Sequence, residues 1–496
     1  MQTTRFEVLS QAEVERIHAA SMEILAEIGI KVNYKPAREL FRQAGAEVDE
    51  NTQAVKIPEK LVRWATEQAP RQFSLYGNDP KFRQEIGPDQ KTPLYAGLGT
   101  PTRIIDQESG AIRPTTLADT IDHMILIDAC ENIHNSQMDV WANDILMTTI
   151  HSEAIWAWAH HSRKTYGMGC YGYLPTWDMM RMMSIAVGGK TELQNRPRFT
   201  AICSVVSPLQ MDQAQAEGLL ICAEYGQPLA ISPEAIAGTT APVTLAGLIT
   251  QENAGILAHI TLAQIFRPGA PVFYGTVSTV ANMRHGTVAL GSVETGLITA
   301  GAAQMARYYG LPCRSVGGVT ESKREDLQAG AERMGTLLPA VLAGVNYITC
   351  AGTLDSTMLE SHAVLMLDDE LCGAATRMAR GIEVNDESMA LDLIKKVGFS
   401  GNYITERHTS KNFRSELFMP KLFSREPYEA WEKDGNHLAI DHARERVREV
   451  LRKHQPYPID PAIESELDAF RQMVNNRSLD DFYLYETEAK QDLRNL

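Results

Sequence analysis

Between residues 92 and 381, short apolar runs alternate with longer segments whose apolar residues recur at helical spacing. Such alternation predicts repeated βαβ units and a parallel sheet. Eight runs have strand character: residues 93–99, 134–141, 164–170, 199–207, 228–232, 271–278, 312–319 and 346–352. Eight strands favour closure into an α/β fold of the (β/α)8 TIM-barrel type over an open sheet.

Each predicted strand is followed by a predicted helix. The segments are residues 116–129, 145–162, 176–187, 212–225, 246–266, 292–309, 326–343 and 358–380. Thr116 and Asp119 have the spacing of a capping box at the start of the first helix. Two short extended runs around Glu108-Ser109-Gly110 also predict a β-hairpin, inserted between the first strand and its helix.

The ends of the chain lack this alternation. Near the amino terminus, Ser10 and Glu13 form a second capping-box pattern, and the helix that follows should end at Gly29. Further helices at 36–44 and 58–68 flank an extended segment at 48–57. Beyond residue 381 we expect a helix at 385–396, a loop-rich passage and two polar helices. The predicted organisation is a mainly helical cap (1–91), a barrel (92–381) and a helical and loop extension (382–496).

The composition of the chain narrows the range of possible binding partners and compartments. The chain has 496 residues and a formal net charge of −15, which disfavours binding to nucleic acids or anionic membranes. Its seven cysteines contain no CxxC pair, so they resemble buried thiols in a reducing compartment more than a disulfide framework or zinc site. The first residues lack the apolar core of a secretory signal. We therefore expect a cytoplasmic protein.

Several common active-site motifs are absent from the sequence. There is no HExxH, no GxGxxG after a strand, no phosphate-binding Walker loop and no GxSxG nucleophile elbow. Lys323 is a poor candidate for a Schiff base, because its charged neighbours suggest a solvated loop. No resident metal site is expected.

Chemistry in such a barrel belongs at the carboxyl ends of the strands. Four aromatic residues should lie there: Trp141, Tyr171, Tyr173 and Tyr274. Together with an acid, aromatic faces can hold a quaternary ammonium group through cation–π attraction. The alternative is that each ring simply packs in the core or at the rim.

Charged residues complete the candidate site. Glu234, Glu321 and Asp355 each follow a predicted strand; they could face the mouth or cap a helix. Arg314 lies inside an apolar strand, where a guanidinium needs an anion. That anion is either a barrel carboxylate or the carboxylate of a substrate. A substrate with both a methylated ammonium and a carboxylate would satisfy both halves of the mouth.

Longer stretches resemble a known family. They are Ala329-Gly330, Leu337-Leu338, Cys350-Ala351-Gly352-Thr353-Leu354, Arg380-Gly381-Ile382-Glu383-Val384-Asn385-Asp386-Glu387, Asn412-Phe413-Arg414 and Pro420-Lys421-Leu422. Together with Gly29-Ile30-Lys31-Val32 they resemble the trimethylamine methyltransferase family across nearly the whole chain. The resemblance implies a barrel that passes a methyl group from a methylated amine to Co(I) of a separate corrinoid protein. The corrinoid (cobalamin) cofactor would then belong to the partner, with none tightly bound here.

The sequence departs from the founding members in one respect, because those carry pyrrolysine in the barrel and this chain has none. Members without it resemble methyltransferases of quaternary amines, which implies glycine betaine as the substrate and dimethylglycine as the product. Proline betaine, carnitine and butyrobetaine stay open as alternative substrates, as does a protein that binds betaines without demethylating them. Homo-oligomers are compatible with the sequence.

Overall fold

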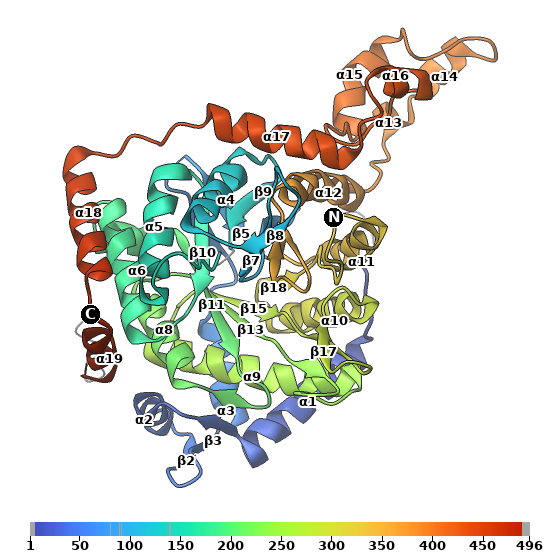
Figure 1. Cartoon of the computed structure of the whole chain (residues 1–496). Helices are drawn as coiled ribbons and strands as arrows, with labels where there is room; N and C mark the ends of the chain where they lie inside the picture. The colour runs from blue at the N-terminus through green and yellow to red at the C-terminus, as the bar shows by residue number, and fades with distance from the viewer. Residues whose placement is uncertain (1–4, 80, 89, 91, 138–139, 489–496) are drawn as a thin grey trace.

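The eight predicted strands close into one parallel barrel (Figure 1). The computed structural model describes residues 5–79, 81–88, 90, 92–137 and 140–488. Around the barrel the strand order is β10-β11-β13-β15-β18-β19-β6-β9. Their bounds are β6 Leu94–Gly97, β9 Ile133–Ser136, β10 Thr165–Gly169, β11 Phe199–Val205, β13 Leu229–Pro233, β15 Val272–Thr276, β18 Cys313–Val316 and β19 Tyr347–Ala351. The barrel prediction is confirmed.

Helices surround this barrel as the apolar periodicity predicts. Their bounds are α4 Leu117–Ala129, α5 Ile150–His161, α6 Tyr173–Ala186, α8 Gln213–Glu224, α9 Leu245–Phe266, α10 Val293–Tyr309, α11 Leu327–Ala343 and α12 His362–Arg380. The capping box of Thr116 and Asp119 starts α4. Three starts differ from the prediction: α5 begins five residues late, α6 begins three residues early, and α12 begins after the short strand β21 (Leu359–Glu360) and its cap Ser361. A short 3-10 turn, η2 (Met147–Thr149), precedes α5, and α7 (Lys190–Asn195) follows α6.

Short strands decorate the carboxyl ends of the barrel strands. The predicted hairpin is present as β7 (Arg103–Ile105) and β8 (Ile112–Pro114), and it forms a small sheet with β20 (Thr353–Leu354) and β21. A second sheet contains β14 (Ile236–Ala237), β16 (Thr279–Asn282) and β17 (Thr287–Ala289). These loops form the rim of the mouth.

The amino-terminal segment carries more strand than the sequence predicts. The predicted helices are α1 (Gln11–Glu23), α2 (Lys35–Gln43) and α3 (Glu59–Gln68), and a π-turn, η1 (Ile24–Ile28), extends α1 to Gly29. The predicted extended segment at 48–57 contains most of β2 (Glu47–Asp49) and all of β3 (Ala54–Lys56). Three further strands were not predicted: β1 Ile30–Val32, β4 Phe73–Tyr76 and β5 Arg83–Ile86. Strand β1 pairs with β12 (Gln210–Met211), which lies between β11 and α8, so the cap shares a sheet with the barrel region. Gly29 has φ +78°, and a Cβ there would lie 2.4 Å from the Val55 oxygen.

The carboxyl-terminal segment splits into two parts (Figure 1). Helices α13 (Asp386–Met389), α14 (Leu391–Val397), α15 (Arg407–Glu416) and α16 (Tyr428–Lys433) contain no buried residue. Helices α17 (Ala439–Lys453) and α18 (Pro461–Asn475) instead bury Ala443, Val447, Val450, Leu467 and Val474 against the barrel helices, and α19 (Leu479–Glu488) follows. We call residues 439–475 the strap.

The prediction about the cysteines can be checked directly. All seven cysteines are buried and free. In the described part of the chain, no helix is both long and apolar enough to cross a membrane.

Candidate active site

Arg314 lies in the barrel lumen, where the packing of neighbouring strands directs it. It is the second residue of β18 and is 1% exposed. Its Nη1 donates to Ser232 Oγ on β13 at 3.2 Å, and its Nη2 donates to Gln137 Oε1 at 3.3 Å. Gln137 directly follows β9, so these two hydrogen bonds cross the lumen from different sides of the closed barrel.

The partners of Arg314 are neutral. Among the residues that the structure describes, none of the ion pairs includes Arg314, and its Nε has no hydrogen-bond partner. The Nε2 of Gln137 is likewise unpaired. A salt bridge with a described barrel carboxylate, one of the two alternatives from the sequence, is therefore not observed. Asp139, near the carboxyl end of the strand predicted at 134–141, is a further carboxylate that could face the mouth, but it lies outside the described residues.

Burial makes this guanidinium costly. Desolvation lowers the Arg314 pKa to about 10, and the opposing influences include the nearby Tyr347 and Glu234. An unpaired buried cation is destabilising unless an anion joins it. The arrangement therefore offers a binding position for an anion.

Polar side chains surround Arg314. Tyr347 on β19 is next to Arg314 in register, and its hydroxyl approaches Thr200 and Asn135 without reaching good hydrogen-bond geometry with either. Gly275 is the β15 neighbour of Arg314, and a Cβ there would lie 2.2 Å from Ser232 Oγ. A glycine at this position keeps room for the Ser232 hydroxyl that Arg314 contacts.

Glu234 stands at the rim above this polar lumen. It follows β13 directly, is exposed, and accepts a hydrogen bond of 3.3 Å from Ser204 Oγ on β11. Its charge acts on the pKa of Arg314. The structure therefore brings Glu234 and Arg314 near one another, with the anion at the rim and the cation in the lumen.

Two of the four candidate aromatic residues meet. The rings of Trp141 and Tyr171 contact edge to face, with centroids 6.1 Å apart and an interplanar angle of 76°. Both residues are half-buried. Tyr171 also lies over Gly169, the last residue of β10, where a Cβ would come within 2.9 Å of its ring. A bulkier residue at the end of this strand would displace the ring.

The other two aromatic residues lie elsewhere. Tyr274 faces the helices, because its hydroxyl donates to Asn253 Oδ1 on α9 at 2.9 Å and its ring stacks on Tyr309 of α10. Tyr173 is the buried first residue of α6 and acts electrostatically on Tyr34 of the cap. Of the four aromatic residues expected to form a cage, only Trp141 and Tyr171 are therefore placed together.

Glu321 and Asp355 already have protein partners. Glu321 Oε1 accepts from Ser356 Oγ at 2.5 Å and from the Gly291 amide at 3.2 Å. Asp355 forms ion pairs of 3.1 Å with Arg103 and with Lys323. Both carboxylates join separate loops of the rim, and neither is seen to act as a helix cap.

Sequence reasoning missed the neutral members of the site. Asn135, Gln137, Thr200, Ser232 and Tyr347 are buried polar residues that all lie in or beside barrel strands. Polar residues inside otherwise apolar strands were the available signal, but their inward orientation depends on register, which the sequence does not show. Among the described residues no cluster of three or more His, Cys, Asp and Glu side chains could hold a metal ion.

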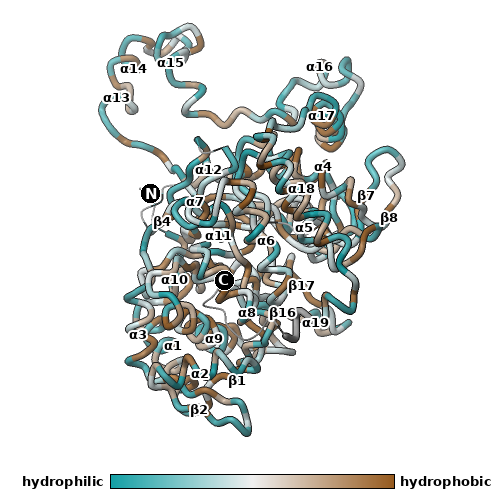
Figure 2. The backbone as a smooth tube through the Cα atoms, turned by 90° about the vertical axis from the view of Figure 1, so that its left-hand side faces the viewer, coloured by the Kyte–Doolittle hydropathy of each residue, from teal (hydrophilic) through white to brown (hydrophobic). Residues whose placement is uncertain are grey.

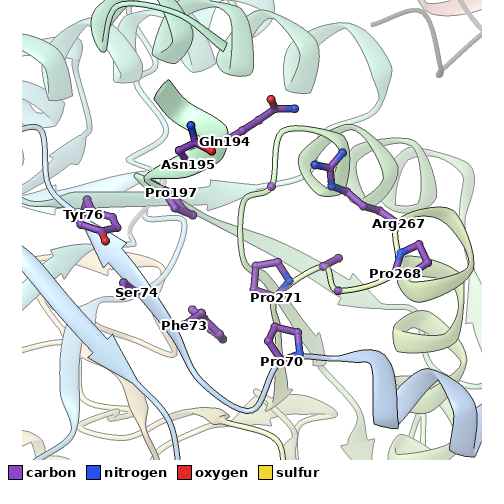
Figure 3. A pocket seen from close by; sticks show the side chains of 13 residues that line it. Pro70, Phe73, Ser74, Tyr76, Gln194, Asn195, Pro197, Arg267, Pro268 and Pro271 are labelled. Atoms are coloured by element: carbon purple, nitrogen blue, oxygen red, sulfur yellow. The ribbon is translucent and has the colours of Figure 1, made fainter. Parts of the chain in front are cut away.

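A cavity of about 410 Å³ lies at the opposite end of the barrel (Figure 3). Pro197 and Pro271, which line it, precede β11 and β15, so it opens at the amino ends of the strands. Pro70, Phe73 and Arg267 contribute further walls. It is separate from the polar lumen around Arg314.

Comparison with known proteins decides the family. The model of the family described as trimethylamine methyltransferase (MTTB) matches residues 1–477. The chain belongs to the trimethylamine methyltransferase family. It is 34% identical to the glycine betaine methyltransferase of Desulfitobacterium hafniense (strain Y51), over 94% of this chain and 96% of that protein.

Other members of the trimethylamine methyltransferase family are similarly close. The trimethylamine methyltransferase MttB of Methanosarcina barkeri (strain Fusaro / DSM 804) is 34% identical over 92% of this chain and 93% of its own. The crystal structure of the Methanosarcina barkeri monomethylamine methyltransferase (MtmB) shares the fold, with a TM-score of 0.51, 13% identity and coverage of 90% and 89%. The resemblance inferred from the sequence and the barrel architecture are both confirmed, and the chain is a methyltransferase of this family.

Proposed function

We propose that this protein transfers a methyl group from glycine betaine to Co(I) of a separate corrinoid protein and releases dimethylglycine. The observation that carries the proposal is Arg314, a buried guanidinium held by neutral partners, with the exposed Glu234 above it. A small zwitterion fits this arrangement, which has a cationic side chain in the lumen and an anionic side chain at the rim. Its carboxylate would enter the lumen toward Arg314, and its ammonium would stay at the rim near Glu234.

The reaction requires little acid–base chemistry from the protein. The electron pair of Co(I) forms the new cobalt–carbon bond, and the breaking C–N bond leaves its pair on nitrogen. Because the quaternary nitrogen is already positive, it departs as a neutral tertiary amine and no proton moves. The protein then contributes by orienting one methyl group and excluding water from the cation.

Each residue has a role in this proposal. Arg314 and Gln137 supply unpaired donors, Nε and Nε2, for the substrate carboxylate. Trp141 and Tyr171 offer aromatic surface for the ammonium. Glu234 attracts the cation through space, since a quaternary ammonium has no N–H to donate. Tyr173, Tyr274, Glu321 and Asp355 hold the surrounding structure in place.

The central test compares two variants that each lose one buried arginine. Arg314→Met should lower kcat/KM for glycine betaine about 100-fold, since hydrogen bonds to charged groups contribute about 1.5–3 kcal/mol each. Arg198→Met is the matched control, because Arg198 is 3% exposed and directly precedes β11, at the far end of the barrel. It should change kcat/KM little. The assay follows dimethylglycine and methylcobalamin with a Co(I) corrinoid protein.

A series of substrates defines the class. Glycine betaine, proline betaine, carnitine and butyrobetaine all carry a carboxylate, whereas choline does not. If the assignment of Arg314 is right, Arg314→Met affects the carboxylated substrates and leaves turnover of any uncarboxylated one unchanged. Calorimetric binding of betaines without corrinoid-dependent turnover would instead favour a binding protein, and equal loss on all substrates would refute the carboxylate contact.

A further inference from the structure

Residues 382–416 form an arm that projects from the barrel and contains α13, α14 and α15 (Figures 1 and 2). The arm leaves from the end of α12. Helix α12 starts near the carboxyl end of β19 and runs back along the barrel. Its own carboxyl-terminal end therefore lies near the amino ends of the barrel strands. The arm therefore starts on the side of the barrel away from the mouth.

The arm has no core of its own. None of its residues is buried, yet eight of its large apolar side chains are between 43% and 112% exposed. They are Ile382, Val384, Met389, Leu391, Ile394, Phe399, Tyr403 and Ile404. At on the order of 100 Å² each, these eight side chains together expose roughly 800 Å² of apolar surface.

Polar contacts give the arm a defined shape. Lys396 and Glu406 form an ion pair of 2.7 Å between α14 and the start of α15, and Lys411 pairs with Glu387 at 2.6 Å. At the base, Glu416 pairs with Arg377 of α12 at 2.7 Å. Glu370 then accepts backbone hydrogen bonds from Lys421, Leu422 and Phe423. The apolar side chains are thus presented on a positioned element.

We propose that the arm docks on a second copy of this chain, so that two or more protomers assemble through exchanged arms. Its apolar surface matches the roughly 800 Å² per partner that a stable interface buries. A segment without a core needs a permanent partner, and a second copy is always present, whereas a methyl-accepting protein binds and leaves. The arm also begins away from the mouth where that acceptor would dock.

Charge agrees with this choice of partner. Residues 382–416 carry six carboxylates and five lysine or arginine side chains, a net of −1. The whole chain carries −15. The arm is thus a nearly neutral, apolar contact region on a strongly acidic protein, which suits association of like-charged copies.

The experiment uses sedimentation velocity of the full chain over a dilution series. The double variant Phe399→Asp with Ile404→Asp should raise the dissociation constant of the assembly by about 100-fold, because each change places a charge in the buried contact. The matched control is Val243→Asp with Met283→Asp, whose side chains are 66% and 73% exposed outside the arm. It adds the same charge and should leave assembly unchanged.

Hydrogen exchange gives a second readout that does not depend on a variant. On dilution below the dissociation constant, amides of 382–416 should exchange faster while those of the barrel strands do not. A monomeric wild-type protein overturns the proposal, and so does an assembly that the arm variant leaves intact or that both double variants disrupt alike. A monomer whose arm variant instead loses methyl transfer at limiting corrinoid protein would assign the arm to that partner.

Discussion

At the scale of single residues, the lumen is organised by one buried cation and the small residues that leave space around it. Arg314 reaches Ser232 and Gln137 because Gly275 and Gly167 lack side chains. A Cβ at Gly167 would lie 2.8 Å from Gln137 Nε2, and one at Gly275 would lie 2.2 Å from Ser232 Oγ. The glycines are therefore part of the proposed carboxylate site.

This geometry predicts the effect of Gly275→Ala. The new methyl group would also lie 2.7 Å from the backbone oxygen of Ile231, so strand β13 must shift. Overpacking of this kind costs about 1–3 kcal/mol of unfolding free energy, measured by urea denaturation, and should also lower kcat/KM. Gly335→Ala in α11 is the control, because a Cβ there meets nothing within 4 Å and the helix gains about 0.5–1 kcal/mol. Equal effects of both changes would contradict this account.

A second buried ionisable group, Glu252, leads to a prediction about how stability depends on pH. Glu252 of α9 accepts a hydrogen bond of 3.0 Å from Thr276, and burial raises its pKa to about 8. Because the folded-state pKa exceeds the ordinary value, the protonated form stabilises the fold at low pH, and this contribution disappears as pH rises through about 8. Glu252→Gln removes the titration, so its stability relative to wild type should rise by about 1.4 kcal/mol per pH unit between pH 5 and 8. Urea denaturation across that range measures the slope, and parallel curves would contradict it.

At the scale of elements, the apolar periodicity of the sequence was sufficient to predict the barrel strands. It was insufficient to predict which side chains point into the barrel. Apolar runs of the right length identified all eight strands, because a parallel strand buried on both faces needs little else. The same uniformity hid which residues point inward, so Tyr274 was expected at the mouth although it packs on α9 and α10. Arg314 was recognisable only because a charge in an apolar run is conspicuous.

The amino-terminal cap shows a different limit of prediction from sequence, because its helices were predicted better than its strands. Its helices carried capping and termination signals that were read correctly, such as Ser10 and Gly29. Strands β1 to β5 are three or four residues long, too short to show alternation. Strand β1 forms its sheet with β3 and with β12, about 180 residues away in the sequence, and no local pattern reports that partner.

The contact between the strap and α5 leads to a prediction about stability at low pH. His161 at the end of α5 contacts His454 after α17, with Nδ1 and Nε2 2.9 Å apart, and burial lowers the His161 pKa to about 4. The His454 pKa is lowered too, chiefly by burial, while Asp128 opposes the shift. Other groups at this contact are His160 paired with Glu464, and Tyr457 hydrogen-bonded to Asp128.

Depressed histidine pKa values mean that the neutral pair favours the fold. This contribution is present above the ordinary pKa of 6.5 and is lost as pH falls toward about 4. His161 is 7% exposed, but His454 is only half-buried, so we expect only about 1 kcal/mol from the pair. His454→Gln should remove that pH dependence from urea denaturation curves between pH 7 and 4.5. The exposed His437→Gln serves as the control, and an equal change in both would refute the assignment.

At the scale of the whole molecule, two opposing forces act on assembly. The net charge of −15 makes copies repel at long range, while the arms offer an apolar contact. Salt screens the repulsion, since the Debye length falls from about 10 Å at 0.1 M to about 3 Å at 1 M. Apolar contact is not weakened by this screening.

Assembly through the arms should therefore strengthen with salt. Between 0.1 and 1 M NaCl we expect the dissociation constant of the assembly to fall by several-fold, measured by sedimentation equilibrium of the wild-type chain. An interface held mainly by ion pairs between copies would show the opposite sign, because screening weakens attraction between unlike charges. The direction of the salt dependence thus separates an apolar arm contact from an electrostatic one, independently of any substitution in the arm.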